Sequence, residues 1–471
     1  MVSSLNGVVM RLVPRGESFT TALSAFRSGD FSTCLAIASH LPGIEALALR
    51  ARCMVRTGNA RGALAILDSV DFVELSHRHA AELLTIRFSA SITLNDFKAA
   101  EEAVMGARAR SYGVGSAELS IELEYYTALF AWSEGRFAEA SAGARACVNS
   151  DRAIPVWLAE DDTLSPFSVG YWKARALELL GMTAAVQGDF EGQAAYLTQA
   201  FSAYDAAQCV DVYAEALMLH NLAVLVRDLQ IPGLESFVRA RYAAIAWPDS
   251  LAAYRFYILQ TLGWCSAMRG DHLGGLREFR RSAEFAPNDA LKISAVLDRA
   301  FLAMELGERF SSAEQLEYAC ELATRVDWER SGGVDRTVLL DLARSIASQD
   351  TLQARRVLER YQALKTPVNP LMLFSQDRRQ RGDECMAIAA VVRAEYQLDR
   401  ATMLFKEAYD IWFAVGYAWR AAAAALEIYT LTGDTFYLDV VAREAAARPL
   451  SWIARRYASV VLDDPAKFVR P

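Results

Sequence analysis

The stretch from Leu259 to Pro287, LQTLGWCSAMRGDHLGGLREFRRSAEFAP, carries the clearest structural pattern in the sequence. One helical run is interrupted by Gly270-Asp271, and a second run follows. Glycine tolerates the left-handed backbone at a helix end, and aspartate can cap the next helix. Small residues at Gly263 and Gly275 allow the two helices to approach closely. The stretch therefore predicts two antiparallel helices joined by a tight turn.

The same turn recurs along the chain as a glycine or asparagine, a polar residue, and often an aromatic residue or alanine. Its first residues are Gly29, Gly58, Asn95, Gly135, Gly188, Gly270, Gly307 and Gly433. Weaker turns at 229–232, 348–350 and 397–399 fill the two widest gaps. Apolar residues then repeat at three- and four-residue intervals, which is typical of amphipathic helices. The pattern predicts about eleven helix hairpins.

Length and composition favour an ordered, all-α repeat protein. A single core of 471 residues would be unusual, whereas a repeat array buries each repeat only against its neighbours. Hydrophobic residues make up 53% of the chain, with 26 Gly and 12 Pro, which is not the composition of a disordered chain. Alanine, the strongest helix former, is frequent, as in Ala421 to Ala425.

Charge and cysteine content limit the partners and the compartment. The net charge of −8 disfavours nucleic-acid binding, and no apolar run reaches the roughly 20 residues that span a bilayer. The N-terminus lacks the apolar core of a signal peptide. The seven cysteines are widely spaced among apolar residues, and we expect them to be reduced and buried. These features predict a cytoplasmic protein without a membrane segment.

The opening stretch resembles one tetratricopeptide unit, whose repeat is about 34 residues long. The features that carry this resemblance are the turn, the Leu262-Gly263 pair, Gly275, Phe279 and Pro287. The segment with Leu180-Gly181 and Gly188-Asp189-Phe190 fits the pattern next best. The resemblance covers most of the chain. It implies an all-α, right-handed superhelical solenoid of about eleven antiparallel helix hairpins.

In tetratricopeptide arrays the first helix of each hairpin lines a concave groove, and the resemblance implies which residues of this chain would do so. The implied partner-binding residues are Glu122, Tyr125, Trp132, Arg175, Glu178, Met182, Tyr257, Gln260 and Trp264. Aromatic and arginine side chains often anchor interfaces. For Tyr125 and Trp132, burial between hairpins is an equally good interpretation, because large aromatics also dominate cores.

The proline-flanked segment KTPVNP at 365–370 is the best candidate for a boundary within the array. It divides the chain into an N-terminal segment at 1–18, a helical array at 19–364 and a C-terminal helical block at 371–471.

The sequence contains no recognisable catalytic or metal-binding motif. It lacks CxxC, a Walker loop, GxGxxG and GxSxG. His77 and His79 are two residues apart, so on a helix they point to different faces and cannot share a metal without further ligands. We therefore expect a non-enzyme with no cofactor and no metal. An enzyme would require Glu160, Asp161 and Asp162 to meet other polar groups in a closed pocket.

The C-terminal part has a second resemblance. It reads LFKEAYDIWFAVGYAWRAAAAALEIYTLTGD at 404–434 and ARPLSWIARRYASVVLDDP at 447–465. This combination resembles the last helical repeats of bacterial LuxR-type transcriptional regulators, in which a helix-turn-helix module follows. The sequence given stops at Pro471, where that module would begin, and no direct nucleic-acid binding is expected from this chain.

Two functions follow from these patterns. The first is a non-enzymatic regulatory or scaffold protein that binds a protein, a peptide or a small effector on its concave face. The second is the effector-sensing and oligomerising region of a bacterial LuxR-type regulator, which would form homo-oligomers. A helix-turn-helix continuing after Pro471 in the natural reading frame would favour the second function.

Overall fold

The structure is a computed structural model of the whole chain, and it describes residues 17–112, 114, 116–150, 167–208, 211–229, 233–329, 333–364 and 376–463. Within these residues it contains helices and no strand, so the predicted all-α class is confirmed. The helices are α1 (Glu17–Arg27), α2 (Phe31–Ala38), α3 (Ile44–Arg56), α4 (Ala60–Asp68), α5 (His77–Thr93), α6 (Phe97–Ser111), α7 (Ala117–Ser133), α8 (Phe137–Val148), α9 (Val169–Val186), α10 (Phe190–Ala206), α11 (Val212–Leu229), α12 (Leu234–Ala244), α13 (Ala252–Met268), α14 (His272–Glu284), α15 (Asp289–Glu305), α16 (Arg309–Arg325), α17 (Gly333–Ile346), α18 (Thr351–Leu364), α19 (Gln376–Ala394), α20 (Leu398–Val415), α21 (Ala418–Thr432), α22 (Thr435–Ala447) and α23 (Trp452–Asp463). A short 3₁₀ turn, η2 (Asp249–Leu251), precedes α13.

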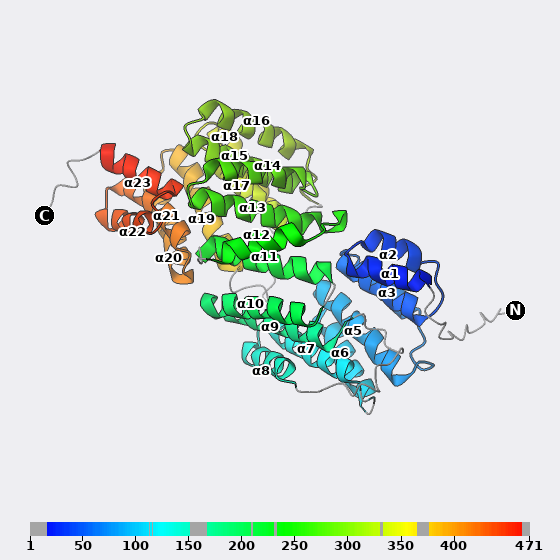
Figure 1. The fold of residues 1–471 in the computed structure, drawn as a ribbon. Helices are drawn as coiled ribbons and strands as arrows, with labels where there is room; N and C mark the ends of the chain where they lie inside the picture. Colours follow the sequence, from blue (N-terminus) through cyan, green and yellow to red (C-terminus); the bar gives the residue numbers. More distant parts are fainter. Residues whose placement is uncertain are drawn as a thin grey trace. The chain divides into compact units, whose positions relative to one another are not determined.

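Consecutive helices pair as the turn pattern predicts. Ten pairs pack as hairpins, from α1 with α2 to α21 with α22, and α23 follows the last of them (Figure 1). All eight predicted turn residues have positive φ angles, between 60° at Asn95 and 87° at Gly270. In six hairpins the next residue caps the second helix through its side chain; these are Asp30, Asn59, Asp96, Asp189, Asp271 and Asp434. The prediction of helix hairpins is therefore confirmed, together with the left-handed turn residues and the side-chain caps that it implied.

The weaker turns had mixed outcomes. The turn predicted at 348–350 is confirmed, since α17 ends at Ile346 and α18 begins at Thr351. The turn predicted at 397–399 lies two residues earlier, because α20 already begins at Leu398 and Tyr396 takes the positive φ of 61°. A tyrosine rather than a glycine occupies that left-handed position, which is why the sequence pattern missed it. The turn predicted at 229–232 falls largely outside the described residues.

The hairpin of α13 and α14 shows how the small residues act. A side chain on Gly263 would place its Cβ 2.6 Å from the ring of Phe279. A Cβ on Gly275 would meet the carbonyl oxygen of Gly263 at 3.0 Å. The two helices are therefore in direct backbone contact at these glycines, and the Phe279 ring fills the space beside them.

Two compact units make up the chain. The first contains residues 1–218 and 245–251, and the second contains residues 219–244 and 252–471. The boundary predicted at 365–370 lies outside the described residues. However, residues on both sides of it share one core, including Leu339 of α17 and Val391 of α19. The second unit therefore continues across the predicted boundary, and the division between the units falls inside α11.

Within each unit the first helices of the hairpins form an inner layer and the second helices an outer layer. On α9, a first helix, the buried residues include the consecutive run Ala176 to Gly181. On α10, its partner, only one stripe at helical spacing is buried, including Leu197, Ala200 and Tyr204. A helix that is buried all round must be covered on several sides. The inner layer is therefore the odd-numbered helices.

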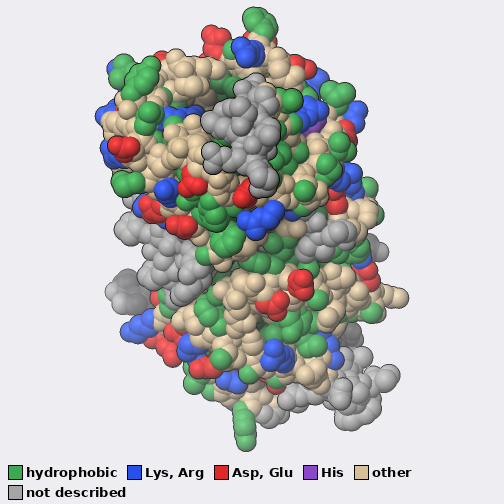
Figure 2. Space-filling view, turned by 90° about the vertical axis from the view of Figure 1, so that its left-hand side faces the viewer, with side chains coloured by type: hydrophobic (Ala, Val, Ile, Leu, Met, Phe, Trp, Pro, Cys, Tyr) green, Lys and Arg blue, Asp and Glu red, His purple; other side chains and the backbone are tan. Residues whose placement is uncertain are grey.

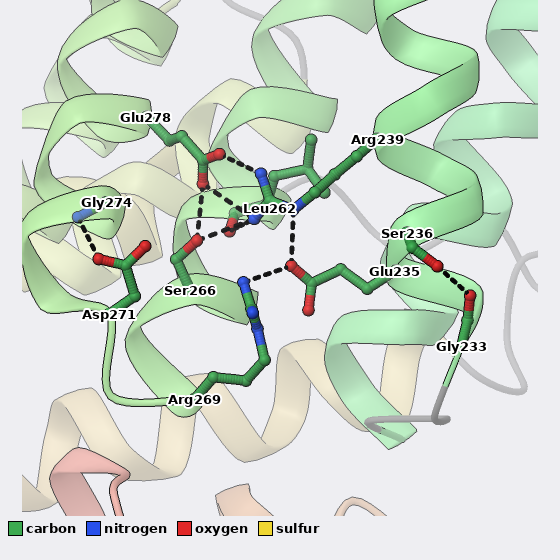
Figure 3. A network of polar contacts seen from close by, with 10 residues as sticks. All are labelled: Gly233, Glu235, Ser236, Arg239, Leu262, Ser266, Arg269, Asp271, Gly274 and Glu278. Carbon is green, nitrogen blue, oxygen red and sulfur yellow. Dashed lines mark hydrogen bonds and ion pairs between the residues drawn. The ribbon is translucent and has the colours of Figure 1, made fainter.

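Helix α12 is held to the next hairpin by a polar network (Figure 3). Arg239 pairs with Glu235 on its own helix and with Glu278 on α14. It also donates to Ser266 Oγ on α13 at 2.8 Å, and Arg269 pairs with the same Glu235. Figure 3 shows Glu235, Ser266 and Glu278 pointing toward the Arg239 guanidinium, and Arg269 pointing toward Glu235. This network fixes α12 on the second unit.

No described helix is both long and apolar enough to cross a membrane.

Candidate functional site in the inner helix layers

Buried charged side chains collect on the inner layers. Arg52, Glu82, Glu122, Glu178, Asp228 and Glu384 are buried and lie on first helices, and Asp211 directly precedes another. Glu444 on α22 is the exception among the buried charged residues of the described chain. Removing charges from water is costly unless they are paired. The inner layers therefore contain buried polar interactions in addition to apolar packing.

A repeated hydrogen bond joins successive first helices. Thr85, ten residues before the turn residue Asn95, donates to Glu122, thirteen residues before Gly135, at 2.9 Å. The same two positions are joined in two other pairs of hairpins. Arg175 donates to the Tyr125 hydroxyl at 3.4 Å, and Gln260 donates to Ser294 Oγ at 2.7 Å. These positions therefore face the neighbouring hairpin's first helix, as expected for residues of an inner surface.

Four of the six predicted residues of the first unit lie in two polar groups, one around Glu122 and one around Arg175. Glu122 is fully buried beside Arg52, with Arg52 Nη2 and Glu122 Oε1 3.5 Å apart. Burial raises the pKa of Glu122, and Arg52 partly opposes this shift. Arg175 pairs with Glu178 and reaches the hydroxyl of Tyr125. Tyr125 is itself only 4% exposed, which agrees with the alternative interpretation that its ring is buried between hairpins.

Trp132 and Met182 lie apart from those two groups. Trp132 is near the end of α7, where its half-buried ring packs against Phe137 with centroids 6.4 Å apart. Met182 is half-buried in the second half of α9. The structure therefore does not bring these two together with Glu122, Tyr125, Arg175 and Glu178.

Arg56 on α3 connects the start and the end of the first unit. Its guanidinium binds the Asp211 carboxylate through two hydrogen bonds of 2.8 and 2.6 Å. The rings of Phe26 and Tyr213 lie on the same guanidinium, with centroids 4.4 and 4.8 Å away. Burial opposes the charge of Arg56, but Asp211 more than offsets this, so the pKa of Arg56 lies above its usual value.

In the second unit, Gln260 belongs to a half-buried polar group. Its Nε2 donates to Ser294 Oγ and to Asp298 Oδ2, each at 2.7 Å. Burial raises the pKa of Asp298 to about 8, with a further contribution from Asp341, while hydrogen bonds from Gln260 and Trp264 partly offset the shift. A carboxyl group with this pKa is mostly protonated at neutral pH and can both donate and accept hydrogen bonds.

Tyr257 and Trp264 lie in aromatic contacts on either side of Gln260. Tyr257 packs against His220, with ring centroids 5.4 Å apart. Trp264 stacks on Trp419 of α21 at 6.0 Å and also contacts Phe301 of α15 at 5.6 Å. All three predicted residues of α13 are half-buried and contact other elements of the second unit.

Helix α23 packs side chains against α15. The rings of Trp452 and Phe301 meet edge-on, with centroids 5.1 Å apart. Four residues further along each helix, Arg456 binds Glu305 Oε1 through Nε at 2.9 Å and Nη2 at 2.5 Å. An aromatic pair and an ion pair at matched four-residue spacing therefore connect the two helices through their side chains.

The described residues contain no group of three or more His, Cys, Asp or Glu side chains that could hold a metal ion. On the face shown in Figure 2, Lys and Arg side chains are interspersed with Asp and Glu. That face has no broad basic patch of the kind that binds nucleic-acid phosphates.

Several residues of these clusters were not predicted from the sequence, notably Arg52, Arg56, Asp211, Asp298 and Glu305. One available signal was the position thirteen residues before the turn, which is Glu82, Glu122 and Arg175 in three successive hairpins. A charged residue recurring there inside an apolar helix indicates an inner polar contact. Asp211 and Glu305 had no such signal, because their partners lie far away in sequence.

Comparisons with known proteins leave the family open. No family model matches the chain, and no curated protein matches it. One similar solved structure is a Rap protein in complex with Competence and Sporulation Factor, with 12% identity over 79% of this chain and 98% of that one, at a TM-score of 0.44. Another is apo RapI, with 11% identity over 88% and 98%, also at 0.44. The Cut9–Hcn1 hetero-tetramer of the APC/C matches at 12% identity over 91% and 89%, with a TM-score of 0.29. At these scores the similarities carry no argument about function.

Proposed function

We propose that this chain is a non-enzymatic regulatory or scaffold protein that binds a protein or peptide partner on the inner layer of its helix hairpins. The observation that carries the proposal is the contact of α23 with α15. Trp452 and Arg456, four residues apart on one helix, meet Phe301 and Glu305, four residues apart on the other. The inner layer thus already accommodates a helix with an aromatic residue and an arginine on one face.

The partner we propose is a helical segment with the same two features. An incoming helix that carries an aromatic residue and an arginine four positions later could replace α23 on Phe301 and Glu305. Recognition of one helix by a surface of others rests on such anchors at i and i+4. The intramolecular α23 would then act as a competitor that any partner must displace.

Of the residues predicted from the tetratricopeptide resemblance, those on α13 belong to this proposal as inner-layer residues of the same unit, and those of the first unit belong to its own inner layer. Tyr257, Gln260 and Trp264 lie on α13 in the same unit as α15 and α23. Glu122, Tyr125, Arg175 and Glu178 belong to the two polar groups of the first unit. Because these side chains already contact one another, partner binding requires the inner layer to open, and that opening is where regulation would act.

The test uses a fluorescently labelled peptide with the sequence of residues 449–462, PLSWIARRYASVVL. It is titrated into the full-length wild-type chain and into the Arg456→Ala variant, and fluorescence polarisation is measured. The variant loses the charged hydrogen bonds that hold its own α23, which are worth about 1.5–3 kcal/mol. We therefore expect the peptide to bind the variant about 10- to 100-fold more tightly than the wild type.

The matched control is the same peptide with alanine at the position of Arg456, which keeps the helix propensity and the aromatic anchor. We expect this control peptide to bind the variant chain more weakly than the first peptide does, because it cannot pair with Glu305. The proposal fails if neither chain binds the first peptide, or if both peptides bind the variant equally well.

A further inference from the structure

Two cysteine thiols meet in the first unit. Cys34 on α2 and Cys53 on α3 have sulfur atoms 3.1 Å apart, and both side chains are completely buried. Both are free thiols. Hydrogen bonding to Cys34 and burial raise the pKa of Cys53, so the Cys53 thiol is protonated at neutral pH.

The Cys34–Cys53 pair lies where two successive hairpins meet. It joins the second helix of the first hairpin to the first helix of the next hairpin. Arg56, which holds Asp211, lies three residues after Cys53 and so one turn further along the same face of α3. A covalent bond between the two sulfurs would fix α2 on the helix that carries Arg56.

We propose that Cys34 and Cys53 are an oxidation site that forms an intramolecular disulfide. A disulfide needs its sulfurs about 2 Å apart, so the pair must close by about 1 Å. Among the described residues, the contact between Cys34 and Cys53 is the one that joins two cysteine sulfurs.

The oxidant is a low-molecular-weight disulfide, such as oxidised glutathione. Solvent base removes the proton of one thiol, and that thiolate attacks a sulfur of the reagent. A protein–glutathione disulfide forms, and one glutathione thiolate leaves. The second protein thiol then loses its proton and displaces the second glutathione. In sum, two protein thiols lose two electrons and two protons, and one reagent disulfide becomes two thiols.

Burial sets the rate of this reaction. Because the sulfurs are inaccessible in the folded state, the first attack requires a local opening of α2 from α3. Once the mixed disulfide forms, the neighbouring thiol is already in place for the second step. The account therefore predicts slow oxidation that ends in the intramolecular disulfide rather than in stable glutathione adducts.

The test incubates the reduced full-length chain with oxidised glutathione, with and without a urea concentration below the unfolding transition. Free thiols are then trapped by alkylation and the digested chain is analysed by mass spectrometry. We expect one disulfide linking the Cys34 and Cys53 peptides, a mass loss of about 2 Da for the intact chain, and faster formation with urea. Cys265 and Cys385, which are also buried, serve as internal controls and should remain alkylated.

Two variants separate the proposal from non-specific oxidation. In Cys34→Ala and in Cys53→Ala the intramolecular disulfide cannot form, and the remaining thiol should carry glutathione or stay reduced. The proposal is overturned if the wild type accumulates glutathione adducts at Cys34 or Cys53, if either cysteine pairs with a different cysteine, or if both thiols survive under the urea condition at which hydrogen exchange shows α2 to be open.

Discussion

The indole rings of Trp264 and Trp419 stack with their centroids 6.0 Å apart and their planes 26° from parallel. The two residues belong to α13 and α21, which are separated by seven intervening helices in the chain. Both rings are on first helices of the second unit. The stack therefore joins distant hairpins of that unit through its inner layer, on the side where Phe301 also contacts Trp264.

A double-mutant cycle measures this stack. We expect Trp264→Ala and Trp419→Ala each to lower the free energy of unfolding by about 3–5 kcal/mol, as is usual for large aromatic truncations in cores. The free energy of unfolding of the double variant should fall by about 0.5–1.5 kcal/mol less than the sum of the two single losses. Each single variant already removes the interaction between the two rings, so the sum includes that interaction twice. Urea unfolding followed by far-UV circular dichroism gives the values. Strict additivity would show that the rings do not interact.

The close approach of α13 and α14 makes a second prediction. Gly263→Ala places a methyl group 2.6 Å from the Phe279 ring, and we expect a loss of about 1–3 kcal/mol from overpacking. The matched control is Gly106→Ala on α6, where the new methyl would meet only Leu84 Cδ1 at 3.4 Å. There the helix propensity of alanine should stabilise the chain by up to about 1 kcal/mol. Equal effects at the two sites would contradict the packing described.

A pH dependence follows from Asp298. Its pKa is raised to about 8 from an ordinary value of 3.8. The folded chain therefore holds this proton more tightly than the unfolded chain, and the contribution of Asp298 to stability falls as pH rises between those two values. Asp298→Asn keeps an oxygen acceptor for Gln260 but cannot ionise.

The difference between the two proteins should therefore change with pH. We expect Asp298→Asn to gain stability relative to the wild type between about pH 5 and about pH 8.5, measured as the shift in thermal midpoint at each pH. A difference independent of pH, or one that changes with the opposite sign, would show that Asp298 is ionised throughout in the folded chain.

The Arg56–Asp211 pair supports a fourth prediction. Arg56→Met leaves the Asp211 carboxylate buried without its two charged hydrogen bonds, and we expect a loss of about 3–5 kcal/mol. Adding Asp211→Asn removes the unpaired charge while keeping an oxygen that accepts from the Ala214 backbone amide. The double variant should recover part of the loss. If the double variant were less stable than Arg56→Met, the Asp211 carboxylate would have to stabilise the fold through a contact other than the one with Arg56.

What the sequence could predict depended on the distance between interacting residues. Some contacts lie within one hairpin, such as the turn at Gly270-Asp271 and the contact of Gly263 with Phe279. Others join neighbouring hairpins, such as the hydrogen bonds between the position ten residues before one turn and the position thirteen residues before the next turn. A repeat pattern reports such contacts because each unit meets the next in the same way. It could therefore indicate that Gln260 and Glu122 face the inner layer.

The contacts of Trp264 with Trp419, Glu305 with Arg456 and Arg56 with Asp211 were beyond the sequence. They depend on how far each unit curves, which is the sum of small rotations at many helix interfaces. No single residue encodes that sum. The sequence left open whether Tyr125 is buried or lines a groove, and the structure shows it buried, while Trp264 stacks on Trp419.

The most direct measurement of the central proposal is hydrogen–deuterium exchange of α23 in the full-length wild-type chain, with and without an excess of the 449–462 peptide. If a helical partner binds by replacing α23 on Phe301 and Glu305, amides at 452–462 should exchange faster when the unlabelled peptide is present, while those of α19 stay unchanged. If the peptide binds and α23 keeps its full protection, the partner site is not the surface that α23 covers, and the account of inner-layer binding is contradicted.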